Sequence, residues 1–233
     1  MDMAKKRQNK VTRARKAIGG FLALIAVGFL VMSFYFGTGL NNLGPAVEGE
    51  DYTLLDTPLT NQKRDTIEVI EYFSYRCIHC KNFEPFLEDW LDEIPENVSF
   101  ARQHVVFSTS DELFARTHLA MQQSPNYSSL HNRLFSAVHD RQKQFTDVAD
   151  ITSYLEDYDL DPNEFNRSFA STRTDRRLTN NRSRQARSQL TATPSLLISG
   201  KYLISMNNGQ PRALEVASEL IEREKNLKIK SLP

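Results

Sequence analysis

The sequence predicts an α/β fold that carries an inserted α-helical domain and is preceded by an N-terminal transmembrane helix. Three observations predict it: a strand–helix–strand succession over residues 66–107, about 80 residues of helical pattern after it, and a basic N-terminus followed by an uncharged apolar run. The strand–helix–strand succession is typical of a βαβ unit, in which the helix packs on a sheet. With 233 residues, 25% charged and 40% hydrophobic, the chain suits one such domain with appendages.

The central strand and the helix after it are the best-marked elements. Residues Thr66–Phe73 (TIEVIEYF) are β-branched and aromatic, which predicts a largely buried strand. Apolar side chains follow at helical spacing over residues 81–91, and Val98–Phe107 predicts the next strand. Pro85 lies inside the predicted helix and is expected to kink it, because proline removes an internal hydrogen bond. Alternation along the strand places Glu71 on its inward face.

The only two cysteines, Cys77 and Cys80, lie where this strand ends and the helix begins. Two cysteines at i and i+3 on a first helical turn can come within bridging distance, roughly 5.5–6 Å between Cα atoms. Unpaired backbone N–H groups and the helix dipole favour a thiolate at the first of them. Cys77 is therefore predicted to be the exposed nucleophile and Cys80 the shielded resolving thiol. His79 adds a titratable group that favours the thiolate further when protonated.

Two other uses of the cysteine pair are less well supported. A zinc site needs two more ligands at suitable spacing, but the chain has no other cysteine. A purely structural disulfide across two residues gains little chain entropy. A redox-active disulfide without metal or bound cofactor is therefore predicted. The other histidines are scattered along the sequence and are expected to be ordinary helix-surface or core residues: His104, His118, His131 and His139.

Two segments carry a resemblance to a known family. Residues 71–84 (EYFSYRCIHCKNFE) resemble the active-site segment of the DsbA family, bacterial periplasmic thiol–disulfide oxidoreductases with a thioredoxin fold. That family typically has Cys-Pro-His-Cys, so Ile78 departs from its pattern. Residues 193–202 (TPSLLISGKY) resemble the family's cis-proline loop and following hairpin. The resemblance covers roughly Tyr52–Leu227 and implies a thioredoxin fold with an inserted helical domain.

The resemblance also implies an activity and roles for single residues. It implies disulfide formation or exchange in exported polypeptides with free thiols, without a cofactor, and reoxidation by a membrane quinone-linked oxidase of the DsbB type. An acid at the position of Glu71 is usual in the family, which supports a proton acceptor for Cys80; the alternative is an edge position open to water. A cis bond between Thr193 and Pro194 is implied as well, with the backbone of Thr193 free to pair with a substrate peptide.

The N-terminal region has the pattern of a membrane anchor. Residues 1–16 hold seven Lys or Arg against one acid, and no charge appears between Lys16 and Glu48. Residues 17–36, at ~1.5 Å each, reach about 30 Å, the thickness of a bilayer core. The basic flank predicts an uncleaved, single-pass anchor in the bacterial inner membrane, with a cytoplasmic N-terminus and a periplasmic catalytic domain. A cleaved signal peptide is the alternative, because residues 37–39 are small.

These patterns divide the chain into six segments. Arginine-rich residues 167–187 are expected to form a solvated helix face, with a docking patch for a partner or lipid headgroups as the alternative. The zero net charge gives no reason to expect a nucleic-acid partner. The predicted segments are a basic cytoplasmic segment (1–16), a transmembrane helix (17–36), a linker (37–50), a thioredoxin-like first part (51–107), an inserted helical domain (108–188) and a thioredoxin-like second part (189–233).

Two other functions stay open at this point. A disulfide reductase or isomerase of the same fold would use the same two cysteines. A membrane-tethered copper-binding chaperone would use Cys77, Cys80 and a histidine as ligands.

Overall fold

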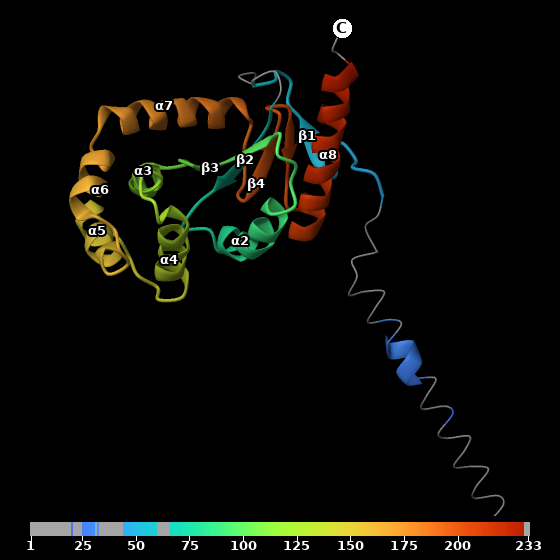
Figure 1. Cartoon of the computed structure of the whole chain (residues 1–233), viewed down its shortest axis with the longest axis horizontal. Coiled ribbons are helices and arrows are strands. Elements are labelled where there is room, and N and C mark those ends of the chain that lie inside the picture. Colours follow the sequence, from blue (N-terminus) through green and yellow to red (C-terminus); the bar gives the residue numbers. More distant parts are fainter. Residues whose placement is uncertain (1–19, 21–24, 31, 33–43, 60–65, 231–233) are drawn as a thin grey trace, which may run out of the picture. The chain divides into compact units, whose positions relative to one another are not determined.

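The computed structural model describes residues 20, 25–30, 32, 44–59 and 66–230 (Figure 1). The basic segment 1–16 and most of the predicted transmembrane segment 17–36 lie outside the described residues. Within the described part of the chain, no helix combines the length and the apolar character needed to cross a membrane. The chain divides into two compact units, 1–44 and 45–233, and the fold below is that of the second unit.

A five-stranded sheet forms the centre of this unit, in the order β1-β5-β4-β2-β3. The central strand β2 pairs in parallel with β3 and antiparallel with β4, and β5 pairs antiparallel with both β4 and β1. The α/β expectation is thereby confirmed. The strands are β1 (Tyr52–Leu54), β2 (Ile67–Phe73), β3 (Val98–His104), β4 (Ser195–Ile198) and β5 (Tyr202–Ile204).

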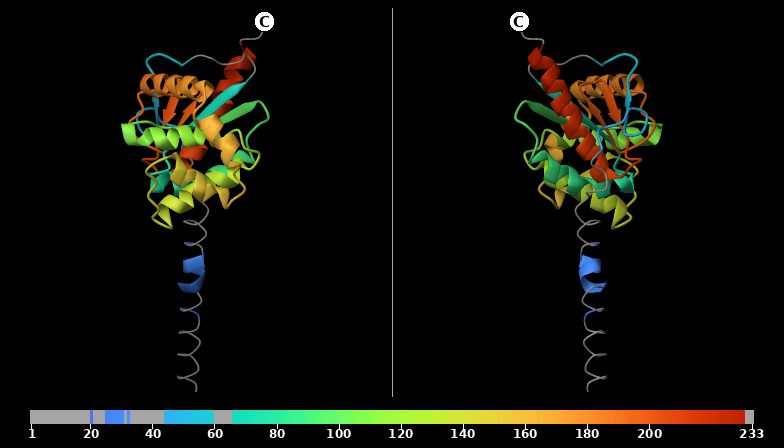
Figure 2. Two further views of the ribbon diagram at one scale, coloured as in Figure 1. Left: turned by 90° about the vertical axis from the view of Figure 1, so that its left-hand side faces the viewer. Right: turned by 90° about the vertical axis from the view of Figure 1, so that its right-hand side faces the viewer.

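One face of the sheet is covered by α2 (Ile78–Leu91) and the C-terminal helix α8 (Gln210–Lys230), as Figures 1 and 2 show. Val69 of β2 packs there in a core with Leu87 of α2 and Leu220 of α8. The helix α2 is unbroken through Pro85. The next residues of β2 face the other way because side chains alternate along a strand. On that face, Ile70 and Tyr72 of β2 form a second core with residues from three other segments of the chain, Leu59, Val105 and Leu197.

The expected helical insertion lies between β3 and β4. Several of its helices begin at side chains that accept hydrogen bonds from free backbone N–H groups, such as Asp147, Asp161 and Ser171. A third core joins this insertion to the strand–helix junction, because Phe73, Tyr75 and Cys80 pack with its apolar side chains. The helices are η2 (Thr109–Asp111), α3 (Glu112–Met121), α4 (Tyr127–His139), α5 (Val148–Glu156), α6 (Pro162–Phe169) and α7 (Thr172–Arg187).

The turn between β4 and β5 depends on a glycine. Gly200 has a φ of +61°, and a Cβ there would lie 2.3 Å from the carbonyl oxygen of Leu59. We expect Gly200→Ala to lower the free energy of unfolding by about 1–2 kcal/mol, because the left-handed backbone and the contact both oppose a side chain. Urea unfolding measures this loss. Gly49→Ala is the control, since Gly49 has a φ of +86° with nothing within 4 Å; an equal loss in both variants would contradict a steric contribution.

Candidate active site

The two cysteines occupy the first turn of α2, as the spacing predicts. Cys77 is the N-cap residue, and its sulfur accepts a hydrogen bond from the backbone N–H of Cys80 at 3.3 Å. Cys77 is partly exposed, whereas Cys80 is fully buried. Both are free thiols, so the structure describes the reduced, dithiol form. The pair therefore presents one sulfur to solvent and shields the other.

The surroundings shift the pKa values of the two thiols in opposite directions. A hydrogen bond from the Cys80 thiol is the largest influence that lowers the pKa of Cys77, which falls from 9.0 to about 5 although burial opposes it. Hydrogen bonds from Thr193 and from the backbone N–H groups of Cys80 and His79 lower this pKa further. Burial raises the pKa of Cys80 well above its usual value, and the neighbouring Cys77 sulfur raises it further. At neutral pH, Cys77 is the thiolate and Cys80 the thiol.

The loop before β4 brings a distant segment beside Cys77. The carbonyl oxygen of Thr193 lies 3.4 Å from Cys77 Sγ, where a protonated thiol donates to it. The Thr193–Pro194 peptide bond is cis, so the expected isomer is confirmed. His79, between the cysteines, is exposed, and its carbonyl oxygen accepts a hydrogen bond from Gln210 Nε2 at 2.8 Å. The backbone N–H of His79 is one of the groups that lower the pKa of Cys77.

Glu71 lies on β2, inside the sheet, in the strand that leads into the two cysteines. Its side chain is fully buried, because β2 is flanked by β3 and β4; the alternative of an edge position open to water is wrong. Burial and the charge of Glu84 raise the pKa of Glu71 to about 8, although Arg102 opposes them. Arg102 Nε lies 3.1 Å from a Glu71 oxygen, but without the geometry of a hydrogen bond. Glu71 is therefore held largely as the neutral acid at neutral pH.

A buried polar network that sequence reasoning missed continues from Glu71. Arg102 Nη2 donates to Glu84 at 2.7 Å, and Glu84 also accepts from His131 Nε2 at 3.1 Å. The other ring nitrogen of His131 then accepts from the Tyr75 hydroxyl at 2.7 Å. Burial raises the pKa of Glu84, but the contacts with His131 and Arg102 outweigh it, so the pKa falls. The network therefore holds Glu84 as the anion.

Three buried histidines surround Phe73, and none of them was predicted to bind a ligand. Their ring centroids lie 5.2 Å (His104), 4.9 Å (His118) and 5.1 Å (His131) from the ring of Phe73. Burial lowers the pKa of all three, to about 4 for His104, so they are neutral core residues. Of the three, His131 bonds to side chains of the network that reaches Glu71, whereas His104 accepts from the backbone N–H of Tyr75 and His118 Nε2 lies 3.0 Å from the carbonyl oxygen of Arg102. Over the described residues, no group of three or more histidine, cysteine or acidic side chains is arranged to hold a metal ion.

Comparisons with known proteins agree with this geometry. A model of the Thioredoxin family matches residues 63–223. The thiol:disulfide interchange protein DsbA of Azotobacter vinelandii is 27% identical over 197 residues, which cover 83% of this chain and 92% of that protein. The Pseudomonas aeruginosa protein of the same name is 26% identical over 204 residues, covering 87% of this chain and 96% of its own.

Solved structures show the same fold. The crystal structure of Pseudomonas aeruginosa DsbA matches with a TM-score of 0.75 and 25% identity, over 78% of this chain and 96% of that one. The oxidoreductase DsbA of Xylella fastidiosa matches with a TM-score of 0.73 at 24% identity, over 78% of this chain and all of the other. A partly exposed thiolate above a buried thiol, at the start of the active-site helix of a thioredoxin fold, is the arrangement that thiol–disulfide exchange requires. The chain belongs to the thioredoxin-fold DsbA family of thiol:disulfide oxidoreductases.

Proposed function

We propose that this protein works in the oxidising direction and introduces disulfides into exported polypeptides. The observation that supports it best is the opposed acidity of the two thiols, with the pKa of Cys77 lowered to about 5 and that of Cys80 raised. A substrate thiolate attacks Cys77 of the oxidised protein, the bond between the cysteines breaks, and Cys80 leaves and takes up a proton. A second substrate thiolate then attacks the substrate sulfur of this mixed disulfide and releases Cys77 as a thiolate, which a low pKa favours. The substrate loses two electrons and the protein gains them.

The other predicted site residues take roles in this cycle. Glu71, neutral and buried, supplies the proton to Cys80 and accepts it when Cys80 is reoxidised. Thr193, whose carbonyl oxygen lies beside the Cys77 sulfur, pairs with the backbone of the substrate peptide, and Pro194 shapes that loop. The exposed imidazole of His79 favours the Cys77 thiolate when protonated.

The sequence and the family support a proposed location and redox partner. Seven positive charges before an apolar run of twenty residues support an inner-membrane anchor with a periplasmic catalytic domain. A quinone-linked membrane oxidase of the DsbB type would accept the two electrons and restore the disulfide. The reductase or isomerase alternative uses the same site, and the direction of exchange separates it from an oxidase. Nothing in the described part of the chain adds a third ligand to the two cysteines, so the copper-chaperone alternative gains no support.

Parallel thermal melts of the reduced and oxidised proteins test the oxidising direction. Because the folded pKa of Cys77 is lowered from 9.0 to about 5, its thiolate stabilises the reduced fold fully above pH 9 and not at all below pH 5. After allowance for solvent screening of a half-exposed group, we expect on the order of 1–2 kcal/mol at pH 7. The reduced form should melt roughly 2–6 °C above the oxidised form at pH 7, and this difference should shrink towards pH 5.

The two outcomes separate the competing functions. An oxidised form that is clearly the more stable at pH 7 would contradict the oxidase and favour a reductase. The double variant Cys77→Ser/Cys80→Ser, which cannot change redox state, is the control for effects of the reductant on the rest of the fold.

A further inference from the structure

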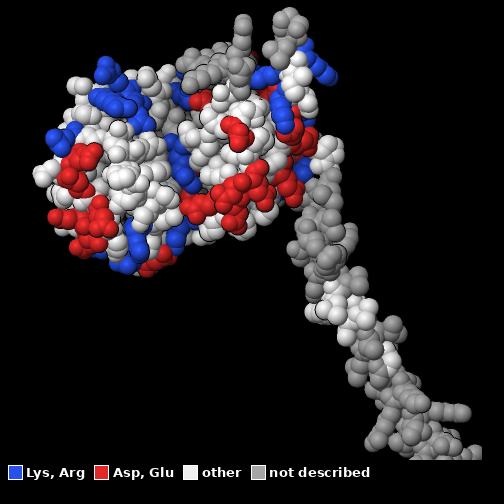
Figure 3. Space-filling model, in the orientation of Figure 1, with Lys and Arg blue, Asp and Glu red and all other residues white. Residues whose placement is uncertain are grey.

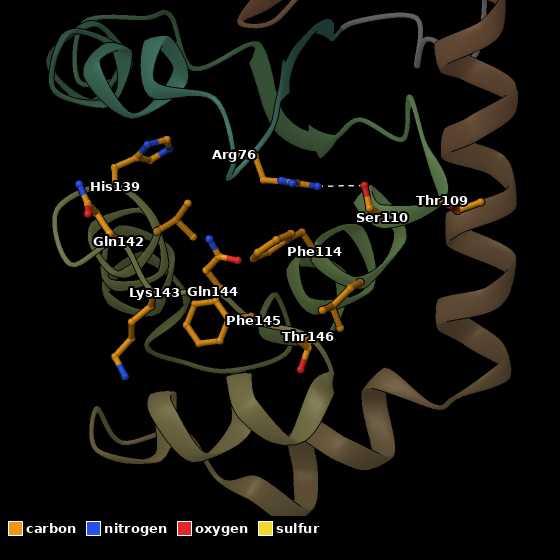
Figure 4. A pocket seen from close by; sticks show the side chains of 12 residues that line it. Arg76, Thr109, Ser110, Phe114, His139, Gln142, Lys143, Gln144, Phe145 and Thr146 are labelled. Atoms are coloured by element: carbon orange, nitrogen blue, oxygen red, sulfur yellow. Dashed lines mark hydrogen bonds between the residues drawn. The ribbon is translucent and has the colours of Figure 1, made fainter.

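A pocket of about 590 Å³ opens between the active-site turn and the inserted helices (Figure 4). Its lining comes from the residue before Cys77, from η2 with the start of α3, and from the end of α4 with the segment after it. No residue of the loop around Pro194 lines it, so it is separate from that loop. Its size falls in the range of binding pockets, about 300–1,000 Å³.

The lining combines apolar, polar and cationic side chains. Four apolar side chains line the pocket: Leu113, Phe114, Val138 and Phe145. Arg76 points into it, and its Nη1 donates to Ser110 Oγ at 2.9 Å (Figure 4). Lys143 lies at the rim, with its ammonium 5.0 Å from the ring centroid of Tyr154. None of the 12 lining residues is Asp or Glu.

The carboxylates of Asp111 and Asp140, which adjoin lining residues in the chain, have other partners. Asp111 accepts hydrogen bonds from the backbone N–H groups of Phe107 and Ser108, and Asp140 pairs with Lys81. In the described part of the chain, Arg76 itself has no carboxylate partner. Four of its five N–H donors are therefore free to bind an anionic ligand.

The positive charge of Arg76 contrasts with the acidic surface of α2. Acidic side chains gather on the face of Figure 3 where α2 lies, and α2 exposes Glu88 and Asp89, followed by Asp92 and Glu93. A substrate with acidic residues is repelled there. Because Arg76 directly precedes Cys77 in the chain, a peptide whose cysteine reacts with Cys77 reaches the pocket within a few residues, at ~3.3–3.6 Å per extended residue.

We propose that this pocket, with Arg76 at its mouth, is a substrate subsite that binds an acidic side chain of the polypeptide a few residues from its reacting cysteine. The apolar side chains of Phe114 and Phe145, which line the pocket, then accommodate an apolar side chain beside that acid. The proposal deepens the proposed function and rests on it: the pairing of the substrate backbone with Thr193 holds any sequence, whereas Arg76 distinguishes one polypeptide from another.

The test uses the full-length Cys80→Ala protein and peptides whose single cysteine carries a 2-pyridyl disulfide. The Cys77 thiolate attacks the peptide sulfur, a Cys77–peptide disulfide forms, and pyridine-2-thione is released and measured by its absorbance. Peptides differ only in one residue, Asp, Asn or Lys, placed at each of four positions on either side of the cysteine. Each rate is divided by the rate with 2,2′-dithiodipyridine, a small neutral disulfide that does not reach the pocket.

We expect the Asp peptide to react roughly three- to tenfold faster than the Lys peptide, at one or two adjacent positions on one side of the cysteine only. Arg76→Glu should abolish or reverse this preference, and Arg76→Gln should reduce it to near unity. Arg173→Glu, the same change of charge at an exposed position on α7, should leave it intact. High salt should weaken the preference because the groups are exposed.

Each contrary outcome identifies what has failed. A preference equal at all positions, or one that Arg173→Glu removes as fully as Arg76→Glu does, would overturn the subsite in favour of a general field effect. The absence of any charge preference, with normal reaction towards 2,2′-dithiodipyridine, would overturn the subsite while leaving the proposed function standing. If Cys77 of the reduced protein with both cysteines reacts with 2,2′-dithiodipyridine no faster than free cysteine does, the activated thiolate on which the proposed function rests would instead be refuted.

Discussion

Cys80→Ala should accumulate mixed disulfides with its substrates, whereas Cys77→Ala should form almost none. In Cys80→Ala, Cys77 loses the hydrogen bond from the Cys80 thiol but keeps those from Thr193 and from the backbone N–H groups of residues 79 and 80, so its pKa stays below 9.0. In Cys77→Ala, burial keeps the pKa of Cys80 raised, so at pH 7 its thiolate is about 1% at most. The rates of attack by the two remaining cysteines should therefore differ roughly tenfold or more, and the burial of Cys80 widens the gap. Both variants should lose catalytic turnover, because each lacks one of the two sulfurs.

Non-reducing gels and mass spectrometry of complexes trapped by acid measure this difference. The matched control is the double variant, which accounts for peptides that adhere without a covalent bond. Complexes formed in equal yield by the two single variants would contradict the assignment of Cys77 as the nucleophile, since that assignment depends on unequal access and acidity.

Glu71→Gln should stabilise the protein and Glu84→Gln should destabilise it, although both changes replace a buried carboxyl by an amide of the same size. The folded pKa of Glu71 is raised from 4.5 to about 8, so its carboxyl opposes folding increasingly as pH rises through that window. Removing it should raise the free energy of unfolding by about 2–3 kcal/mol at pH 7 and by almost nothing at pH 4. The pKa of Glu84 is lowered, so its anion stabilises the fold at neutral pH through Arg102 and His131.

Urea unfolding of the three oxidised proteins at pH 4 and pH 7 tests these signs. The Glu71→Gln variant also separates proton transfer from stability. It should slow the reoxidation of Cys80 and flatten the pH dependence of that rate, even though the variant is more stable. Loss of stability in Glu71→Gln at pH 7 would contradict the raised pKa of Glu71. A stability gain of the same size at pH 4 would contradict its electrostatic origin.

Local sequence patterns were sufficient for the junction that bears the cysteines. The β-branched run before Cys77 and the helical spacing after Cys80 predict a strand that ends where a helix begins. The alternation of side chains along β2 correctly predicted that Glu71 faces inward. The position of Cys77 at the start of a helix correctly predicted that free backbone N–H groups act on its sulfur, and those of Cys80 and His79 do lower its pKa. The hydrogen bond from the Cys80 thiol, the largest influence that lowers this pKa, depends on how the two side chains are oriented, which the sequence does not show.

The network around Glu71 could not be predicted because no local pattern records its contacts. Parallel pairing of β2 with β3 sets Glu71 opposite Arg102, a register that depends on how the connecting helix packs. His131 reaches Glu84 from α4, 47 residues further along the chain. The pocket beside Arg76 could not be predicted for the same reason, since the residues that line it come from three separated segments. Periodicity indicates which side chains turn inward, but tertiary packing decides which of them meet.

The third core, shared by Phe73, Tyr75 and Cys80 with the inserted helices, makes the insertion impossible to excise cleanly. A shortened chain with β3 spliced to β4 would keep the sheet, α2 and α8, yet it would leave the inner side of the strand–helix junction bare. Water would then reach Cys80, and the burial that raises the pKa of its thiol would be reduced, so the difference in acidity between the two thiols would narrow. The inserted helices thus contribute to the inequality between the cysteines that gives the exchange its order.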